Sequence, residues 1–344
     1  MSGAAKTLPQ TRGLSKRYAL VTASCCLSLL LGVAASLAFG SRSLSLEDII
    51  GGLTHDIPAT LGETVVQRRI PRTIFGLMAG AALGMSGALM QAITRNPLAD
   101  PGILGVNTGA ALFVVAGIAF LGISTPGQYI VLALCGAALS AVFVYAVGSI
   151  GGRGATPVKL ALAGSATSAA LSSLISAIML PRAAVMDAFR FWQVGRIGGA
   201  TWDGIRSVAP FLAAGALLGL CSLSALNALA LGDDVAAGLG LRVGRARLIA
   251  AAAGVMLCGA TTALAGPIAF VGLMVPHVIR LAVGVDQRWI IPLSAAGGAA
   301  ILLYSDVIGR LLGRPGELEA GIVTAFLGAP VLIYVAARTK VRDL

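Results

Sequence analysis

The feature that most constrains this chain is a series of apolar stretches, each about twenty residues long and separated by short polar turns. An α-helix rises about 1.5 Å per residue, so about 20 apolar residues cross the hydrocarbon core of a bilayer. No water is available there to satisfy backbone amides, which must bond within their own helix. The long unbroken runs exclude the alternating pattern of a membrane β-barrel. The sequence therefore predicts an all-α polytopic membrane protein embedded in a lipid bilayer.

Ten such stretches can be placed along the chain, at about 18–39, 73–93, 102–123, 128–150, 158–180, 206–231, 245–265, 267–284, 289–306 and 321–337. The first stretch follows several basic residues and has no small-residue cleavage site, so we expect a retained helix rather than a secretory signal. The eighth stretch begins at Pro267, which lacks a backbone N–H, and there we expect a break followed by a shorter helix. We therefore expect about ten transmembrane helices.

Charge sets the expected orientation. With an even number of crossings and the N-terminus inside, all four lysines lie on the cytoplasmic side: Lys6, Lys16, Lys159 and Lys340. We therefore expect a cytoplasmic segment over 1–17, a transmembrane domain over 18–338 and a cytoplasmic tail over 339–344. Ten arginines fall on the outer side against the usual bias: Arg42, Arg68, Arg69, Arg72, Arg182, Arg190, Arg196, Arg206, Arg310 and Arg314.

The composition excludes several classes of function. Charged residues make up 11% of the chain, against about a quarter in a soluble domain, so no ATPase or kinase domain fits. The net charge of +11 has no compact basic domain to carry it, which argues against a nucleic-acid partner. The five cysteines all fall in apolar stretches without metal-ligand spacing. No catalytic motif stands in a suitable context, so we expect neither an enzyme nor a metal site.

Three motifs stand out from ordinary lipid-facing sequence. The first runs from Arg69 through a glycine-rich helix with Gly80, Gly84 and Gly87, which we expect to form a face for close packing, to Asn96-Pro97-Leu98-Ala99-Asp100-Pro101-Gly102, where Asp100 is expected to be an N-cap. The second is Gly232-Asp233-Asp234-Val235-Ala236-Ala237-Gly238-Leu239-Gly240-Leu241. The third is Gly266-Pro267-Ile268-Ala269-Phe270-Val271-Gly272-Leu273-Met274-Val275-Pro276-His277, followed later by Gly321 to Pro330.

Together these motifs resemble the FecCD-type permeases, the membrane subunits of binding-protein-dependent ABC importers for iron chelates, haem and cobalamin. The resemblance runs from about residue 45 to the C-terminus, and the outer-loop stretch from Phe191 to Trp202 shares it. It implies a ten-helix permease of the cobalamin and iron-chelate type, which dimerises with a second copy or a paralogue around a central pathway. The helices at about 158–180 and 321–337 are the candidates to line that pathway.

The resemblance also implies partners and sites. A separate ATPase subunit would bind ATP and Mg, so no cofactor is expected in this chain, and an extracytoplasmic binding protein would deliver the substrate. The segment 232–244 matches the family's coupling helix through Gly232, Asp233, Asp234, Val235, Ala236, Gly238, Leu239, Gly240 and Leu241. The simpler alternative is a solvated loop that caps the next helix. Arg69, Arg72 and Arg310 match the positions that meet acidic residues of the binding protein, with pairing to Glu63, Asp306 or Glu317 as the alternative.

A gradient-driven secondary transporter or channel is the main rival function. Such proteins usually place ionisable groups near the membrane midplane, whereas the acids of this chain lie at the ends of the apolar stretches or in turns. His277 is more simply interpreted as a packed histidine than as a proton carrier. Among importer cargoes, a ferric siderophore is the first expectation, with haem and cobalamin as alternatives.

Overall fold

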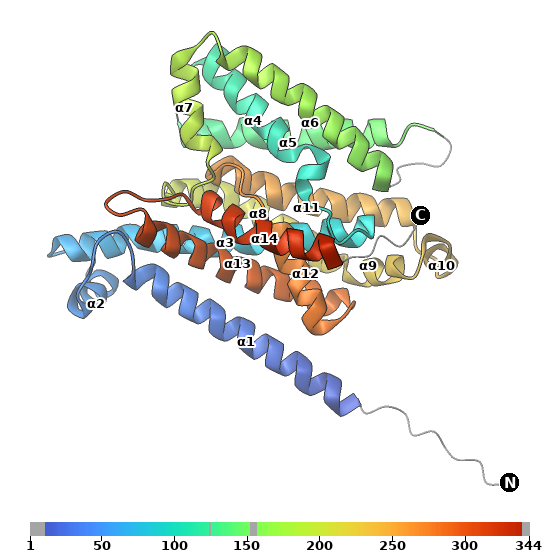
Figure 1. Ribbon diagram of the computed structural model, residues 1–344, viewed down its shortest axis with the longest axis horizontal. Helices are drawn as coiled ribbons and strands as arrows, with labels where there is room; N and C mark the ends of the chain where they lie inside the picture. The colour runs from blue at the N-terminus through green and yellow to red at the C-terminus, as the bar shows by residue number, and fades with distance from the viewer. Residues whose placement is uncertain (1–10, 124, 152–156, 339–344) are drawn as a thin grey trace.

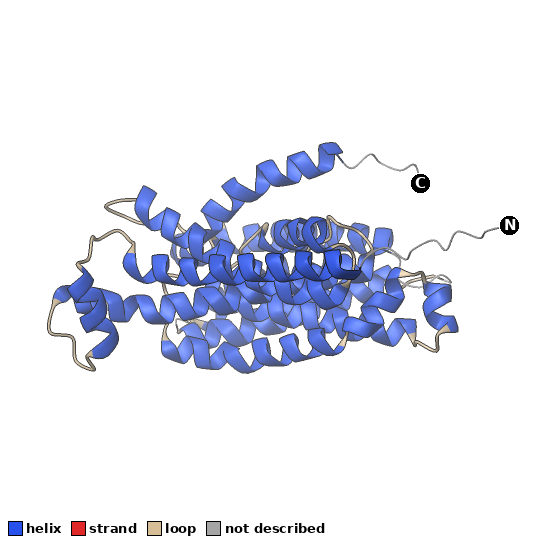
Figure 2. Cartoon of the chain, turned by 90° about the horizontal axis from the view of Figure 1, so that it is seen from below, coloured by secondary structure: helices blue, strands red, loops and turns tan. Residues whose placement is uncertain are grey.

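The computed structural model describes residues 11–338, apart from residue 124 and residues 152–156. The expected tail 339–344 and the first ten residues of segment 1–17 lie outside the described residues. Within the described part of the chain, every regular element is a helix (Figure 2). The expectation of an all-α protein is therefore confirmed.

The ten expected apolar stretches all form helices. Seven are long and apolar enough to cross a membrane: α1 (Thr11–Ala38), α3 (Leu61–Thr94), α5 (Pro126–Gly148), α6 (Pro157–Met179), α8 (Trp202–Cys221), α11 (Val243–Ala265) and α13 (Gln287–Leu312). Three are shorter apolar helices: α4 (Val106–Ala116) continued by the π-helical turn η2 (Gly117–Leu121), α12 (Val271–Val283) and α14 (Ala320–Arg338).

Most of these helices run roughly along the long axis of the molecule, and the remaining short helices, which are not among the ten, lie toward its two ends (Figure 1). One end carries α2 (Leu46–Thr54), α7 (Ala183–Gln193) and the beginning of α3. The opposite end carries α9 (Leu223–Ala230) and α10 (Asp233–Gly238), and α1 begins and α14 ends toward it. We call these the outer end and the inner end, after the orientation that the charge pattern predicts.

The helix α3 forms the centre of the bundle, with 78% of its most apolar window buried. Its glycines bring backbones into direct contact. A Cβ atom built at Gly80 would overlap the carbonyl of Gly298 on α13, and one at Gly84 would overlap that of Ser294 on the same helix. A Cβ at Gly87 would overlap the carbonyl of Gly272 on α12. The predicted close-packing face of this helix is confirmed.

The break near Pro267 is also confirmed. The helix α11 ends at Ala265, and α12 begins only at Val271. Between them, Gly266 has φ +75° and Phe270 has φ +69°, two left-handed conformations that interrupt the helix. The expected N-cap is present as well: an Asp100 side-chain oxygen accepts a hydrogen bond from the Gly102 amide, 2.8 Å away, at the start of the 3-10 turn η1 (Pro101–Leu104).

Two expected boundaries were wrong. The helix α3, which contains the expected stretch 73–93, begins at Leu61 and continues through Pro71. Arg72 therefore lies about three turns inside a helix and not at its start. The expected stretch 206–231 is divided at Ser222 into α8 and α9. The first difference arises because the outer part of α3 is polar, and an apolar run marks only the part of a helix that crosses the membrane.

Candidate functional site

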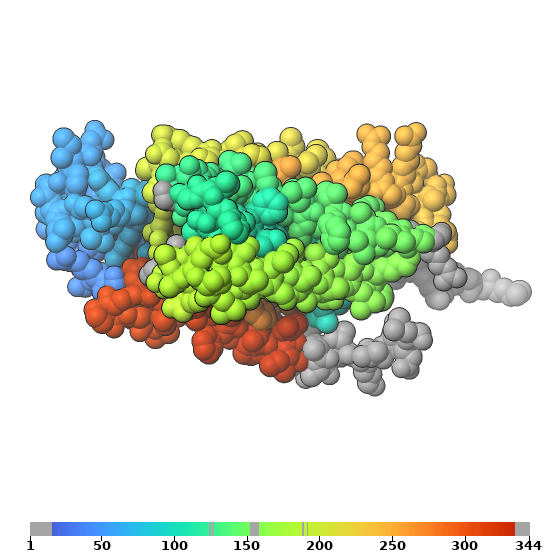
Figure 3. All heavy atoms as spheres, turned by 90° about the horizontal axis from the view of Figure 1, so that it is seen from above, coloured from blue at the N-terminus to red at the C-terminus, as the bar shows by residue number. Residues whose placement is uncertain are grey.

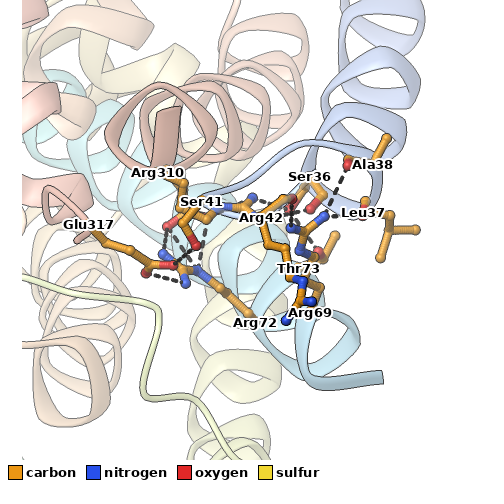
Figure 4. A network of polar contacts seen from close by, with 11 residues as sticks. Ser36, Leu37, Ala38, Ser41, Arg42, Arg69, Arg72, Thr73, Arg310 and Glu317 are labelled. Carbon is orange, nitrogen blue, oxygen red and sulfur yellow. Dashed lines mark hydrogen bonds and ion pairs between the residues drawn. The ribbon is translucent and has the colours of Figure 1, made fainter. Parts of the chain in front are cut away.

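The outer end contains a cluster of charged side chains drawn from three parts of the chain (Figure 4). Arg69 and Arg72 come from α3, and Arg310 comes from the last turns of α13. Glu317 lies in the loop between α13 and α14, and the end of α1 with the turn after it contributes backbone carbonyls. We call these residues, together with Asp306, the outer arginine cluster.

Arg72 bonds two carboxylates at once. Its Nε donates to both carboxylate oxygens of Asp306, at 3.1 and 3.0 Å, and its Nη2 donates to Asp306 Oδ1 at 2.7 Å. Its Nη1 donates to Glu317 Oε2 at 2.7 Å. Such forked contacts between a guanidinium and a carboxylate are among the stronger hydrogen bonds in proteins. Asp306 is 1% exposed, whereas the Glu317 side chain is 36% exposed, so only Glu317 is accessible from outside.

Arg310 shares the buried carboxylate. Its Nη2 lies 3.0 Å from Asp306 Oδ2, and the guanidinium also donates to the carbonyl and hydroxyl of Ser36 on α1, at 3.0 and 3.1 Å. Asp306 therefore lies between two arginines and ties α3 to α13. The only buried guanidinium nitrogen of Arg310 left without a partner among the described residues is Nε.

Arg69 pairs with no carboxylate in the described part of the chain. Its guanidinium donates to the carbonyls of Leu37, Ala38 and Arg42, at 2.8, 3.0 and 3.1 Å. Carbonyl oxygens satisfy its N–H groups but do not neutralise its charge. The three arginines of the cluster face two carboxylates, so the cluster keeps an excess of positive charge.

This environment differs from the one that the sequence suggests. Arg69, Arg72 and Arg310 are 6%, 9% and 1% exposed, so their side chains lie inside the outer end rather than on its surface. The partners that the sequence named as alternatives, Asp306 and Glu317, are the ones present. The third named acid, Glu63, instead contacts His55 and the Ala59 amide.

The inner end carries the expected segment 232–244 in the form of α10, a turn, and the first residues of α11. Gly232 before α10 has φ +120° and Gly240 after it has φ +85°, conformations that glycine adopts without strain. A Cβ atom at Gly238 or Gly240 would meet no other atom within 4 Å. The segment therefore projects from the bundle with open space around its C-terminal half.

One side of this segment is anchored and the other is free. Asp233 accepts a hydrogen bond from Arg247 Nη2, 3.0 Å away, and is also paired with Arg95 at the end of α3. Ala236 is fully buried, and its carbonyl accepts from the Leu241 amide at 3.0 Å. On the opposite side, Val235 and Leu239 are 50% and 67% exposed, and Asp234 is exposed beside them. Asp233 is not the cap of a following helix, because it is the first residue of α10 and its carboxylate is taken by the two arginines.

The surface of α6 differs from that of an ordinary lipid-facing helix. Only 11% of its most apolar window is buried, and its exposed positions include several serines: Ser165, Ser172, Ser173 and Ser176. Three of their hydroxyls bond carbonyls of their own preceding turn, so they remain on the helix surface. In Figure 3, α6 runs across the face of the molecule nearest the viewer. The helix α14 exposes large apolar side chains, with Phe326 77% and Ile333 70% exposed, and α6 does so as well, with Leu162 65% and Leu174 52% exposed.

In the described ranges, no group of three or more His, Cys, Asp or Glu side chains is placed to hold a metal ion. The interactions that sequence reasoning missed are those of Ser36 and of the turn after α1, which hold Arg69 and Arg310. No sequence signal pointed to them, because the contacts to Arg69 are made by backbone carbonyls.

Comparisons with known proteins agree with this arrangement. A model described as the FecCD transport family matches residues 28–338. The ferric enterobactin transport system permease protein of Escherichia coli K12 is 45% identical over 313 residues, which cover 91% of this chain and 93% of that protein. The Fe(3+)-citrate import system permease protein of Bacillus subtilis is 40% identical over 316 residues, with 90% and 92% covered, and the hemin transport system permease protein of Yersinia pestis is 34% identical, with 88% and 90% covered.

Among solved structures, an ABC transporter assigned to the metal-chelate type, in an inward-facing conformation, superposes with a TM-score of 0.80 at 25% identity. The superposition covers 93% of this chain and 99% of that one. The similarity therefore extends over the whole bundle, including both of its ends.

Proposed function

This chain belongs to the FecCD transport family, and we propose from that membership that its cargo is a ferric siderophore, with haem and cobalamin as alternatives. The chain is a membrane permease of an iron-chelate importer. The observation that carries the choice of cargo is the 45% identity to a permease for ferric enterobactin, which extends over nine-tenths of both chains. The family is one of transport proteins, and we assign no catalytic step to this chain.

The energy source in this proposal is a separate ATPase subunit, which binds ATP and Mg. Segment 232–244 is its docking element. Two observations support this role: Val235 and Leu239 are apolar and exposed at the inner end, and the space around Gly238 and Gly240 is open. Exposed apolar side chains on a projecting polar segment are a usual sign of a protein interface. In this role, Gly232, Asp234 and Leu241 set the shape of the turn.

The outer arginine cluster is the docking site for the binding protein in this proposal, through exchange of carboxylates. Glu317 already occupies Arg72 and is the exposed acid of the cluster. An acidic side chain of a binding protein can replace it there, and the excess positive charge of the cluster favours that exchange. Arg69 and Arg310 are buried and contribute positive charge without touching the binding protein. Arg310 also holds Asp306 in place, so its contribution is one of position rather than contact.

The transport pathway is assigned to the interface with a second permease, either a copy or a paralogue, along α6 and α14. The support is the exposed serine-containing surface of α6, which is poorly suited to lipid and well suited to a passage through which a bulky chelate slides.

The orientation is proposed to be that of a cell inner-membrane protein with both termini in the cytoplasm. Cysteine residues introduced one at a time near His55 in the outer end, near Arg190 in α7 and near Val235 in α10 test it in intact cells. A membrane-impermeant thiol reagent is expected to label the first two sites from outside and to reach the third only after permeabilisation. Labelling of the third site in intact cells contradicts the orientation.

Reconstitution tests the function itself. The permease is placed in vesicles with its ATPase, and uptake of a radioactive ferric siderophore is measured with and without the binding protein. We expect uptake only when ATP and the binding protein are both present, and no uptake in response to a proton or sodium gradient alone. Gradient-driven uptake by the permease without ATP would establish the rival class of transporter.

A further inference from the structure

Two connected cavities run along the seam between α5 and α11. The first, of about 290 Å³, lies at the inner end among the ends of α3 and α5, the turn η1 and the start of α11. The second, of about 500 Å³, continues from it between α5, α11 and α8. Leu104, Tyr145 and Ala251 line both cavities, which therefore meet at these side chains.

The second cavity has an apolar lining and opens to the side of the bundle. Its only polar side-chain group is the hydroxyl of Tyr145. Val142, Phe211 and Leu248 along it are 66%, 41% and 53% exposed. Exposed apolar residues in the crossing part of a membrane protein face hydrocarbon or another subunit, and the second permease is assigned to α6 and α14. The cavity is thus a groove accessible from within the bilayer.

The first cavity is lined by one cationic side chain, Arg247, and one carboxylate, Asp100. Arg247 Nη2 is bonded to Asp233, but its Nε is buried and has no acceptor among the residues that the structure describes. A buried charged donor without an acceptor costs free energy, so this nitrogen favours an acidic ligand. Asp100 accepts a hydrogen bond from the Gly102 amide, and burial raises the pKa of its carboxyl group. A cation beside Asp100 would restore its charged form.

We propose that the two cavities together bind one phospholipid of the inner leaflet that carries a phosphoethanolamine headgroup. The phosphate accepts from the guanidinium of Arg247, the ammonium group donates to Asp100, and an acyl chain follows the apolar groove toward Met256. This orientation matches the inner leaflet, since the polar cavity lies at the inner end and the apolar one extends toward the middle of the bundle. A purely anionic headgroup fits less well, because it places its charge next to Asp100 without a second free cation.

The site also touches the proposed coupling segment. The guanidinium of Arg247 bonds Asp233 through Nη2, which leaves its other nitrogens for the phosphate. Both contacts can therefore exist together. A lipid in this position fixes the side chain that anchors α10.

Native mass spectrometry tests occupancy of the groove, on the intact chain extracted from membranes together with the subunits that it retains. Ala252 lines the apolar groove from an exposed position, so Ala252→Trp fills the groove without entering the packed core. Ala213 is exposed on α8 outside both cavities, and Ala213→Trp is the matched control. We expect one phospholipid to be retained per chain in the wild type and the control, and about tenfold weaker retention in Ala252→Trp. Equal retention in all three means annular lipid only and overturns the proposal.

Lipid exchange tests the headgroup. The delipidated protein is offered phosphatidylethanolamine, phosphatidylcholine and phosphatidylglycerol with identical acyl chains. We expect preference for phosphatidylethanolamine, because the quaternary ammonium of choline has no N–H to donate and glycerol has no charge to offer. Asp100→Asn is expected to abolish the preference, and Arg247→Gln to weaken binding of all three lipids. Equal binding of the three lipids to the wild type, or an unchanged preference in Asp100→Asn, overturns the assignment.

Discussion

At the outer end of the bundle Arg72 and Arg310 share Asp306 in the interior, whereas at the inner end Asp233 is shared by Arg95 and Arg247 near the surface. Asp306 and Asp233 each lie between two arginines. The difference lies in solvent: the Asp306 side chain is 1% exposed and that of Asp233 is 43% exposed.

This difference decides how each end can meet a partner. The buried pair is structural, and a partner reaches it only by competing for Arg72 with an internal carboxylate. The exposed pair only anchors a projecting segment, whose apolar side chains are free. A partner at the outer end must displace Glu317 from Arg72, whereas a partner at the inner end packs against the exposed side chains of segment 232–244.

The largest expected effect follows from removing the buried acid. Asp306→Asn leaves two buried arginines with one carboxylate between them, and breaking a buried ion pair in this way costs about 3 to 5 kcal/mol of folding free energy. We expect a large fall in thermal stability of the purified permease, measured by unfolding in detergent. A double variant, Asp306→Leu with Arg310→Met, removes the charge together with one of its partners and should recover part of the loss. A single variant as stable as the wild type would show that the cluster is not structural.

The next effect concerns the projecting segment. Gly240→Val forces a β-branched residue to φ +85°, which costs about 1 to 3 kcal/mol locally. Gly238 has a helical conformation and open surroundings, so Gly238→Val meets nothing within this chain. We expect both variants to insert normally and to lose ATP-driven uptake, Gly240→Val through the shape of the turn and Gly238→Val through its contact with the ATPase. Full uptake by Gly238→Val would remove this surface from the coupling role.

A smaller effect is expected from the competing acid. Glu317→Gln frees Arg72 for a carboxylate of the binding protein, and a partly exposed ion pair is worth up to about 1 kcal/mol, so affinity should rise by up to about fivefold. Added salt should weaken the wild-type complex instead. Surface plasmon resonance on the reconstituted permease measures both. Weaker binding by Glu317→Gln would contradict the exchange.

The smallest effect on stability is expected at Asp233. Its side chain and those of Arg95 and Arg247 are 43%, 39% and 22% exposed, so solvent screens the pair and Asp233→Asn should cost no more than about 1 kcal/mol. The same unfolding assay that reports on Asp306→Asn measures it. A loss as large as that of Asp306→Asn would erase the contrast between the two ends.

The sequence predicts the crossing helices well because an apolar run of about 20 residues, folded as a helix, has the length of the hydrocarbon core of a membrane. It also predicts the break at Gly266-Pro267 and the cap at Asp100, where the chemistry of one or two residues suffices. For the outer arginines it leaves docking and pairing with Asp306 or Glu317 as alternatives. Arg72 and Asp306 are 234 residues apart, and no local pattern reveals that they meet.

The short outer helices were missed for a different reason. The helix α2 has only nine residues, too few to be recognised as a crossing stretch, although Ser45 and Asp48 at its start form a reciprocal capping box that carries a local signal. The start of α3 was missed because its first residues, before the apolar run, are largely polar. Both errors fall outside the apolar runs, where hydrophobicity no longer reports on helix length.

The glycine contacts of α3 also limit which parts of the molecule can slip past one another. Helices held apart by side chains can shift while rotamers readjust, but α3 touches α12 and α13 backbone to backbone and has nothing between them to readjust. These three helices therefore turn or tilt as one rigid block. A passage wide enough for a chelate has to open by movement of the helices outside this block, and α6, with only 11% of its apolar window buried, is among the least enclosed of them.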